Sequence, residues 1–318
     1  MKVISDPAER AWSDDRSVVT IGAYDGLHLG HQAVIGQVKR LAAERNAKSV
    51  LVTFDKHPAT VVRPQSAPLL LTGPDQKLEL LHQTGLDAVV MITFDEQRAA
   101  ESPEDFVQSV LVDCLAASAI VVGADFHFGR GREGNVALLE KLGAEHDFDV
   151  VPVELLERSD GIGEPISSTA IRRALAGGDI QRATSMLGRP FEARGQVVQG
   201  DQRGRLLGFP TANVEVWNQM CLPADGVYAG RFDHPDGTTH DCAINLGRRP
   251  TFYEHADSSL LEAHLLDFDG DLYGEPARVR FTHFLRSERK FDGIDALVAQ
   301  LRDDVEQARS LLIDFNAS

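Results

Sequence analysis

Between residues 17 and 156 the sequence alternates short β-branched runs with longer segments of helical periodicity. Strands separated by helices pair in parallel through right-handed crossovers, so this alternation predicts an open, doubly wound sheet. The runs expected to form strands are SVVTIG (17–22), SVLVTF (49–54), DAVVMITF (87–94), AIVVGADF (119–126) and DFDVVPVELL (147–156). Ligands of such sheets bind at the carboxyl ends of the strands. Residues that follow these runs are therefore the first candidates for a functional site.

The pattern changes near residue 187 to short extended runs separated by turn residues, and HPDGTTH (234–240) is the clearest hairpin turn. Such runs predict antiparallel strands. Apolar spacings of three and four residues then predict an amphipathic helix over residues 294–312. A chain of 318 residues is long enough for two domains that each bury a core. We therefore predict a doubly wound α/β domain over residues 1–186 and an antiparallel β-barrel with a closing helix over residues 187–318.

Composition limits the partners that this chain can take. A formal net charge of -16 and a pI near 5.1 disfavour a protein that holds long nucleic acids on a basic surface, whereas a local pocket can still bind small anions. Cys114, Cys221 and Cys242 form no CxxC pair, so we expect neither a disulfide framework nor a cysteine-rich zinc site. No window approaches the ~20 apolar residues of a membrane span. We expect a cytoplasmic protein with no membrane or nucleic-acid partner.

The segment GAYDGLHLGH (22–31) lies where the first strand should pass into a helix. Glycines at positions 22, 26 and 30 let the backbone approach a ligand, and the start of a helix presents unpaired N–H groups to an anion. His28 and His31 can donate hydrogen bonds to phosphate oxygens whose charge grows in a transition state. Two other interpretations stay open on this segment alone: a zinc site, and an ordinary turn with histidines bonded to the backbone. The strand-to-helix position favours phosphate binding.

GAYDGLHLGH resembles the GxxDGxHxGH signature of the nucleotidyltransferase superfamily, which has a Rossmann-like sheet and is related to class I aminoacyl-tRNA synthetases. A second element of that superfamily, a serine- and threonine-bearing loop, is similar to ISSTAIR (166–172), although SSTAIR alone is typical of a helix N-cap. The resemblance implies catalytic roles for His28, His31 and Arg172. It also implies an ATP-binding set, which is Gly22, Asp25, Gly26, Gly30, Ser167, Ser168 and Thr169.

TFDKHP (53–58) and GADFHFG (123–129) narrow the resemblance to the adenylyltransferase module of prokaryotic bifunctional riboflavin kinase/FAD synthetases. The first motif is usually TFxPHP in that family, and Lys56 replaces the proline here. That departure removes some rigidity from the loop and adds a cation. The resemblance implies a flavin pocket that is made of Phe54, His57, Asp125, Phe126 and Phe128. Alternating phenylalanines on a strand are also typical of a core, so stacking on the flavin and core packing both stay open for Phe126 and Phe128.

A second cluster, GDQRGRLLGFPTAN (200–213), opens the C-terminal half. Thr211 and Asn213 can offer oxygen atoms to Mg²⁺, which prefers oxygen ligands, although PTAN alone can be an ordinary turn. With INLGRRPTF (244–252), LEAHLLDFDGDLYG (261–274) and FLRSERKFDG (284–293), the cluster resembles the riboflavin kinase module. The resemblance implies Glu262 as the base for the ribityl hydroxyl and Asn213 as a second catalytic residue. The remaining implied contacts are ATP at Arg203, Arg205, Gly208, Pro210 and Thr211, Mg²⁺ at Thr211 and Asn213, and flavin at Arg286.

Together the two resemblances imply two reactions with Mg²⁺: riboflavin and ATP give FMN and ADP, and FMN and ATP give FAD and pyrophosphate. The expected partners are these small molecules, and the sequence is compatible with a homo-oligomer. Two rival interpretations are a nucleotidyltransferase for another acceptor such as phosphopantetheine, and a flavin-binding regulator with inactive sites. The first leaves GFPTAN unexplained. The second conflicts with intact His28, His31, Thr211, Asn213 and Glu262.

Overall fold

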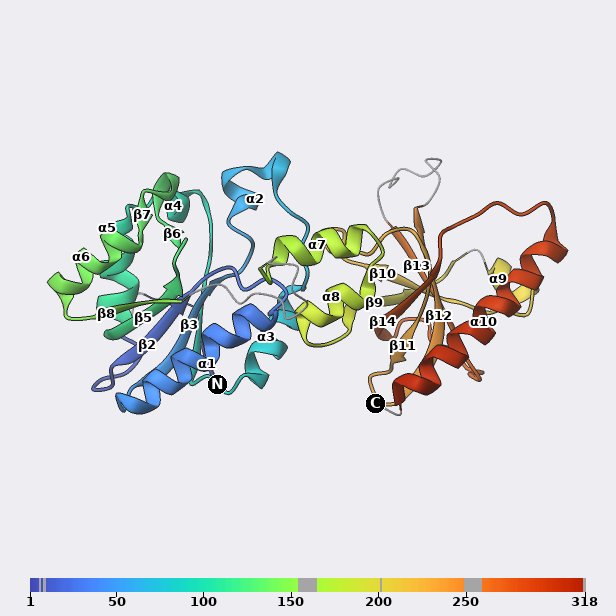
Figure 1. Ribbon diagram of the computed structural model, residues 1–318, viewed down its shortest axis with the longest axis horizontal. Helices are drawn as coiled ribbons and strands as arrows, with labels where there is room; N and C mark the ends of the chain where they lie inside the picture. The colour runs from blue at the N-terminus through green and yellow to red at the C-terminus, as the bar shows by residue number, and fades with distance from the viewer. Residues whose placement is uncertain (6, 8–9, 154–164, 201, 249–258, 317–318) are drawn as a thin grey trace. The chain divides into compact units, whose positions relative to one another are not determined.

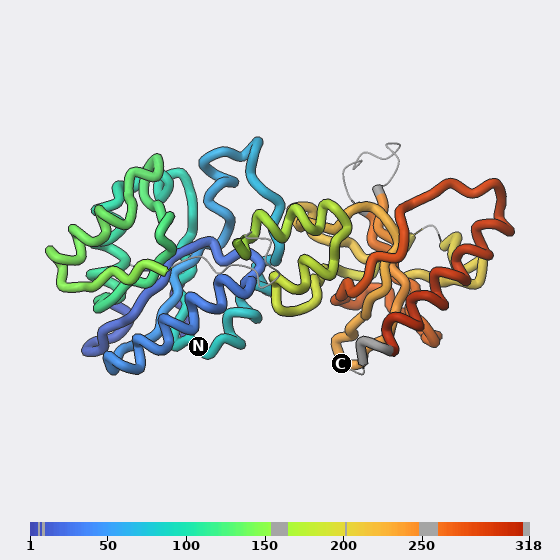
Figure 2. Tube along the Cα trace, in the orientation of Figure 1, coloured from blue at the N-terminus to red at the C-terminus, as the bar shows by residue number. Residues whose placement is uncertain are grey.

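A computed structural model describes the chain except for residues 6, 8–9, 154–164, 201, 249–258 and 317–318. Its contacts divide the chain into two compact units, Met1–Ser168 and Thr169–Ser318 (Figures 1 and 2). Helices α7 (Ser168–Ala176) and α8 (Ile180–Leu187) fall mainly in the second unit, where Ala224 N donates to Leu175 O at 2.9 Å. Each unit is therefore described separately.

The first unit contains a six-stranded parallel sheet in the order β1-β4-β3-β2-β5-β8. Five of the strands match the predicted runs: β2 (Ser17–Ile21), β3 (Lys48–Phe54), β4 (Ala88–Ile92), β5 (Ala117–Gly123) and β8 (Asp149–Val153). An additional edge strand, β1 (Lys2–Ile4), was not anticipated because three residues are too few to show a periodic pattern. The doubly wound parallel sheet is confirmed.

Helices cover both faces of this sheet (Figure 1). On one face, α1 (Leu29–Glu44) and α3 (Pro74–Gln83) share a core with Val18 and Leu51. On the other face, Val19 packs in a core with α5 (Pro103–Phe106), the π-helical segment η2 (Val107–Cys114) and α6 (Val136–His146). Neighbours Val18 and Val19 thus enter opposite cores, as the two-residue period of a strand requires. The shorter elements are α2 (Ala59–Val62), η1 (Pro64–Ser66), α4 (Glu96–Ala99), β6 (His127–Phe128), η3 (Arg130–Arg132) and β7 (Gly134–Asn135).

The order of the strands places three of the sequence motifs at one edge of the sheet. The chain runs outward from β2 through β3 to β4, then returns to β5 on the other side of β2. This reversal is the topological switch point at which open α/β sheets bind ligands. GAYDGLHLGH follows β2, TFDKHP spans the end of β3, and GADFHFG spans the end of β5. The three motifs therefore meet at the carboxyl ends of adjacent strands.

The second unit contains a closed antiparallel barrel in the order β10-β13-β12-β11-β14-β9. Its strands are β9 (Phe191–Val198), β10 (Ala212–Val216), β11 (Gly226–Asp233), β12 (Thr239–Arg248), β13 (Ser259–Leu265) and β14 (Pro276–Arg286). The final helix, α10 (Ile294–Asn316), packs Ala308 and Leu312 against Ala229 and Ala243. The predicted barrel and closing helix are confirmed. A short helix, α9 (Arg203–Leu206), follows β9.

Candidate functional sites

The turn after β2 holds the two histidines of GAYDGLHLGH against each other. His28 is the N-cap of α1, and its Nδ1 accepts a hydrogen bond from His31 N at 3.3 Å. The two imidazole rings stack with centroids 3.6 Å apart. Because Nδ1 of His28 is an acceptor, a neutral His28 carries its proton on Nε2. The turn therefore offers an N–H donor at the start of a helix, where anions are favoured.

Glycine is required at two positions of this turn. Gly26 has a φ of +83°, and a Cβ there would lie 2.7 Å from Leu71 Cδ1. A Cβ on Gly30 would lie 3.1 Å from His28 Nδ1 and 3.2 Å from Ile166 O. Tyr24 adopts a φ of 49° although it is not glycine, so the turn stores backbone strain of the kind found at functional sites. The close approach of Gly30 to Ile166 also brings GAYDGLHLGH against ISSTAIR.

The serine-rich element meets the histidine turn directly. Ser168 Oγ donates to Asp25 O at 2.9 Å, across 143 residues of sequence. Ile166, just before it, is buried with its carbonyl beside Gly30. The structure thus joins the two segments that the nucleotidyltransferase resemblance paired. Thr169 and Arg172 lie on α7, and their contacts with a nucleotide stay a prediction.

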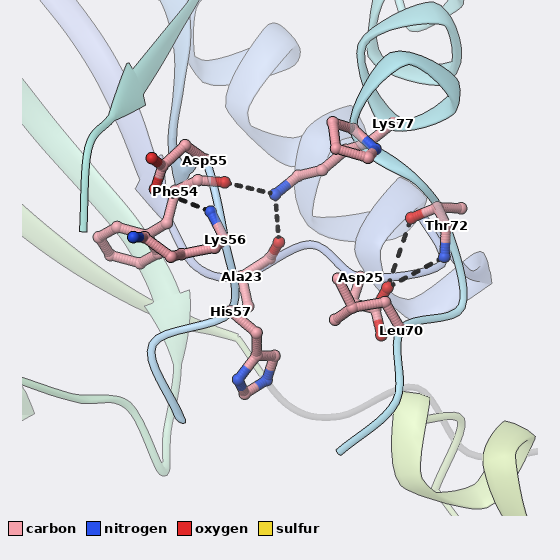
Figure 3. A pocket seen from close by; sticks show the side chains of 10 residues that line it. Ala23, Asp25, Phe54, Asp55, Lys56, His57, Leu70, Thr72 and Lys77 are labelled. Atoms are coloured by element: carbon pink, nitrogen blue, oxygen red, sulfur yellow. Dashed lines mark hydrogen bonds between the residues drawn. The ribbon is translucent and has the colours of Figure 1, made fainter. Parts of the chain in front are cut away.

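Asp25, which the resemblance assigned to ATP, is fully occupied by the protein. Its carboxylate is 5% exposed and accepts from Leu71 N at 2.9 Å and from Thr72 N at 3.2 Å. Thr72 Oγ1 lies 3.4 Å from the same carboxylate, and Gly26 N donates to this hydroxyl (Figure 3). Asp25 therefore fixes the turn to the segment that precedes α3. A contact between Asp25 and ATP stays a prediction.

Sequence reasoning missed Lys77, on α3. Its Nζ donates to Ala23 O at 2.7 Å and to Phe54 O at 3.2 Å (Figure 3). It also donates to Thr53 Oγ1 at 2.7 Å. Burial lowers the pKa of Lys77 to about 8, against the opposing attraction of Asp25 and Asp55. All three donors of the ammonium are satisfied. Lys77 therefore ties the loop after β2 to the end of β3.

His31 is held in its neutral form. Burial lowers its pKa well below the ordinary value, and the positive charges of His28 and Lys77 act in the same direction. Its ring also contacts Tyr24, with centroids 4.7 Å apart. Nδ1 of His31 has no hydrogen-bond partner among the described residues although it is buried. The geometry suits a neutral imidazole whose Nδ1 can form a hydrogen bond with a polar group of a ligand.

The TFDKHP loop lines a cavity beside the histidine turn (Figure 3). The cavity-lining residues are Ala23, Asp25, Phe54, Asp55, Lys56, His57, Leu70, Thr72, Pro74 and Lys77. Phe54 packs edge-on against Phe94 with ring centroids 5.1 Å apart. His57 Nδ1 accepts from Ala59 N at 3.1 Å and so begins α2. The structure places Phe54 and His57 at one cavity, as expected of two flavin-pocket residues.

The two phenylalanines of GADFHFG differ in burial. Phe128 is 9% exposed and belongs to the core of the first unit, where a Cβ on Gly134 would lie 2.8 Å from its ring. Phe126 stacks on Phe128 with centroids 5.5 Å apart and is only partly buried. Asp125 is exposed beside them. Phe126 therefore presents more ring surface to a ligand than Phe128 does.

In the second unit, three polar residues lie side by side on neighbouring strands. Asn213 on β10 pairs in register with Glu262 on β13, which in turn pairs with Asn245 on β12. Asn245 Nδ2 donates to Glu262 Oε2 at 3.3 Å. Asn245 was not singled out from the sequence, although it is the asparagine of the INLG segment. Cross-strand neighbours project from one face of a sheet, so these side chains form one cluster.

Gly200 and Gly204, from the glycine-rich run before GFPTAN, lie close to Asn213 and Thr211. A Cβ on Gly200 would lie 2.4 Å from Asn213 Nδ2, and one on Gly204 would lie 3.7 Å from Thr211 Oγ1. Gly208 has a φ of +86°. Asn213 is 6% exposed, and Thr211 is partly exposed just before β10. Both residues thus face a backbone cradle that only glycine leaves open.

Other residues of the kinase motifs flank the cluster. Arg203 and Arg205 lie on α9, and Pro210 O lies 2.7 Å from His264 Nδ1. Burial raises the pKa of Glu288, with Asp225 and Glu262 adding to the effect against Arg286. The second half of INLGRRPTF, residues 249–252, and the aspartate at position 201 lie outside the described residues.

Arg286, expected at the flavin, makes a two-pronged ion pair with α10. Its Nε and Nη2 donate to the Asp304 carboxylate at 2.8 and 2.7 Å. The Asp304 side chain is 3% exposed, whereas that of Arg286 is 20% exposed. This pair fastens the final helix to β14. The expected contact with flavin is untested.

Three further observations concern the described part of the chain. No group of three or more histidine, cysteine or acidic side chains there is placed to hold a metal ion. No helix there is long and apolar enough to cross a membrane. Cys114, Cys221 and Cys242 form no disulfide with one another, and all three are buried.

Comparison with known proteins gives the same two-part division. A family model described as FAD synthetase matches residues 10–170, and one described as riboflavin kinase matches residues 187–312. A bifunctional riboflavin kinase/FMN adenylyltransferase from Listeria monocytogenes is 37% identical over 302 residues, which cover 94% of this chain and 93% of that protein. One from Escherichia coli K12 is 38% identical over 92% of this chain and 91% of that protein. A crystal structure described as a macrolide-efflux protein from Streptococcus pneumoniae is 30% identical and covers 97% of this chain and 98% of its own, with a TM-score of 0.84.

Proposed function

The chain belongs to the family of bifunctional riboflavin kinase/FMN adenylyltransferases, and from this membership we propose how its two sites divide the chemistry. The enzyme phosphorylates riboflavin to FMN with ATP and adenylylates FMN to FAD with release of pyrophosphate. The N-terminal site performs the adenylyl transfer, and the barrel site performs the phosphorylation. The similarity to whole bifunctional relatives, over 94% of the chain in one case, is the observation that carries this conclusion.

In the N-terminal site, the FMN phosphate attacks the α-phosphate of ATP in line, the bond to the β-phosphate breaks, and pyrophosphate leaves. His28 and His31 donate hydrogen bonds to the departing charge. The low pKa of His31 supports this role, because a neutral imidazole can donate a hydrogen bond without changing its protonation during turnover. By the family resemblance, Ser167, Ser168, Thr169 and Arg172 also bind the triphosphate, and the Ser168–Asp25 hydrogen bond supports this role for Ser168.

In the barrel site, Glu262 takes the proton from the 5'-hydroxyl of riboflavin, and the hydroxyl oxygen attacks the γ-phosphate of ATP. The bond between the γ-phosphorus and the bridging oxygen breaks, and ADP leaves. The hydrogen bond from Asn245 supports this role because it holds the carboxylate in one orientation. Thr211 and Asn213 supply hard oxygen donors beside the glycine cradle, a donor set that fits Mg²⁺. When bound with ATP, Mg²⁺ neutralises phosphate charge. Arg203 and Arg205 on α9 approach the nucleotide, and Gly208 and Pro210 shape the turn.

We further propose that residues 1–186 and 187–318 are the functional domains and that the enzyme works in the cytoplasm, free of nucleic acid and membrane. The two family matches, which end at residue 170 and begin at residue 187, support the limit between the domains. Three buried cysteines that form no disulfide are in keeping with a reducing compartment. A homo-oligomer is compatible with this assignment.

The test is a product assay on the purified full chain with riboflavin, ATP and Mg²⁺, with the flavins separated by chromatography. We expect FMN to form first and FAD to follow. FMN alone would remove the adenylyltransferase assignment, and bound but unchanged riboflavin would favour a regulator. Supplied phosphopantetheine tests the rival acceptor. Transfer of AMP to phosphopantetheine in place of FMN would overturn the acceptor assignment.

A further inference from the structure

Two lysines line the cavity of the N-terminal site, and their surroundings differ. Lys77 is buried and donates to three oxygen atoms of the protein. Lys56 is exposed on the loop that follows β3. Figure 3 shows that the Lys56 side chain extends away from Lys77. The Lys77 ammonium therefore holds parts of the protein together, whereas the Lys56 ammonium is exposed, although both lysines line one cavity.

The other charges of the cavity are already engaged by the protein. The Asp25 carboxylate accepts from Leu71 and Thr72, and Asp55 Oδ1 accepts from Lys56 N at 2.8 Å and Phe94 N at 2.9 Å. The Lys77 ammonium has no donor left, because its three protons are directed at Ala23, Thr53 and Phe54. The two carboxylates are negatively charged and the Lys77 ammonium is saturated by the protein, so none of these groups offers a cation to an anionic substrate.

The Lys56 ammonium is the exception among these groups. It makes no hydrogen bond or ion pair with any described residue, whereas its backbone N–H is fixed by Asp55. The start of the side chain is thus positioned, and its charged end is available to a ligand. An ammonium near water still attracts a multiply charged anion, and this attraction weakens as salt is added.

The adenylyl transfer needs a cation of this kind. It joins two anions, because a phosphate monoester such as FMN carries about -1.5 to -2 charges at neutral pH and attacks a nucleotide triphosphate. Resting on the proposed function, we propose that Lys56 Nζ binds the phosphate of FMN and thereby selects a phosphorylated flavin as the acceptor. Lys56 is then a specificity residue of this chain, at a position where related TFxPHP loops have proline.

The experiment compares Lys56→Met with Lys56→Arg in the full-length enzyme. Methionine keeps an unbranched stem and the backbone N–H that Asp55 holds, but it has no charge. We expect Lys56→Met to raise KM for FMN about tenfold, the size of one charged hydrogen bond at a partly exposed site, with kcat and KM for ATP nearly unchanged. Lys56→Arg keeps the charge and should stay near the unmodified KM. Added salt should raise KM for FMN in the unmodified enzyme and much less in Lys56→Met.

Two controls separate this contact from other effects. Lys141→Met removes another exposed lysine from the same unit, on α6, and should leave both reactions unchanged. Inhibition of FAD formation by lumiflavin, the flavin ring without a ribityl phosphate, should be the same in Lys56→Met and the unmodified enzyme. An unchanged kcat for FAD formation, together with unchanged inhibition by lumiflavin, confirms that the N-terminal unit of Lys56→Met is folded.

The inference is overturned if Lys56→Met leaves KM for FMN unchanged, if KM for ATP rises instead, or if lumiflavin inhibition weakens as much as FMN binding. Weaker inhibition by lumiflavin would place Lys56 at the flavin ring instead of the phosphate. Failure of the unmodified enzyme to make FAD from FMN would instead remove the proposed function. The two failures are therefore distinguishable in one set of assays.

Discussion

The two sites of this enzyme are built in different ways. In the N-terminal unit the reacting groups lie on loops that follow strands, and buried polar side chains hold those loops: Asp25 binds the segment before α3, and Lys77 joins the ends of β2 and β3. In the barrel, Asn213, Glu262 and Asn245 lie within strands, so the register of the sheet fixes their spacing. The geometry of the N-terminal site therefore depends on buried polar side chains that hold its loops. The geometry of the barrel site depends on the pairing of the strands.

The sites also differ in the charge state of their main side chains. In the proposed function, the N-terminal site presents a neutral His31 and backbone N–H groups to a polyphosphate. In the same proposal, the barrel site presents the Glu262 carboxylate to a hydroxyl that must lose a proton. Hydrogen-bond donors that stabilise a departing anion can keep their protonation state during the reaction, but a general base must accept a proton. Substitutions that remove each chemistry separately are the strongest tests of this difference.

The largest expected effect is on adenylyl transfer in the double variant His28→Ala/His31→Ala. Loss of two donors to the departing pyrophosphate should lower kcat for FAD formation from FMN by about 10⁴-fold. Riboflavin phosphorylation by the same protein should continue at the unmodified rate, as measured by FMN release. FAD synthesis at a normal rate would contradict the phosphate role of the pair.

Glu262→Gln should produce the converse result. The amide keeps the shape of the side chain but cannot accept the proton of the ribityl hydroxyl, so kcat for FMN formation should fall by about 10³-fold. FAD synthesis from supplied FMN should be unaffected. Equal loss of both activities would show that the two sites are not independent and would break the comparison.

Most of the architecture could be predicted because it depends on local periodicity. Alternating apolar runs predicted five of the parallel strands, and turn residues predicted the barrel. The missed strand β1 has three residues, and α9 occupies a glycine-rich run that has no helical periodicity. The π-helical segment η2 lies within one of the segments of helical periodicity between the predicted strands. Apolar spacings do not show whether the backbone of such a segment forms the i→i+5 hydrogen bonds of a π-helix or those of an α-helix.

The candidate sites were predictable where short motifs carry the chemistry, and not where distant residues support it. Lys77 belongs to the amphipathic segment PDQKLELLHQ, and nothing in that spacing shows that its ammonium is buried among backbone carbonyls. The partners of Asp25 lie 46 and 47 residues along the chain. Asn245 was visible in INLG, but its role depends on pairing with Glu262 across two strands. Long-range contacts of this kind need the folded chain.

A smaller effect is expected on the free energy of unfolding of the barrel alone. Asp304→Asn removes the buried partner of Arg286 and should lower the free energy of unfolding of the barrel by about 2 kcal/mol, because it leaves a guanidinium without its counter-charge. Urea unfolding followed by Trp217 fluorescence reports on the barrel, with Trp12 changed to phenylalanine. The matched variant Asp267→Asn breaks the exposed pair with Arg309 and should leave the transition unchanged. Equal destabilisation by both variants would show that burial of the pair is not what matters.

The smallest expected effect is a pH dependence that belongs to the N-terminal unit alone. The pKa of Lys77 is about 8 in the folded chain and returns to its ordinary value of 10.5 when the chain unfolds. Between these values the unfolded chain binds more protons, so the free energy of unfolding should rise as pH increases from 8 to 10.5 and should not change from this cause below pH 8.

The rise from this one group should be on the order of 1 kcal/mol by pH 9.5, and Lys77→Met, which does not titrate, should lack it. The measurement is urea unfolding of both proteins followed by Trp12 fluorescence, with Trp217 changed to phenylalanine. The other lysines and tyrosines titrate in both proteins, so the difference between the two curves isolates Lys77. A difference that stays constant from pH 7.5 to 9.5 would mean that the three hydrogen bonds of the ammonium outweigh the cost of burying it. Lys77 would then act as a permanently charged clamp between the two loops.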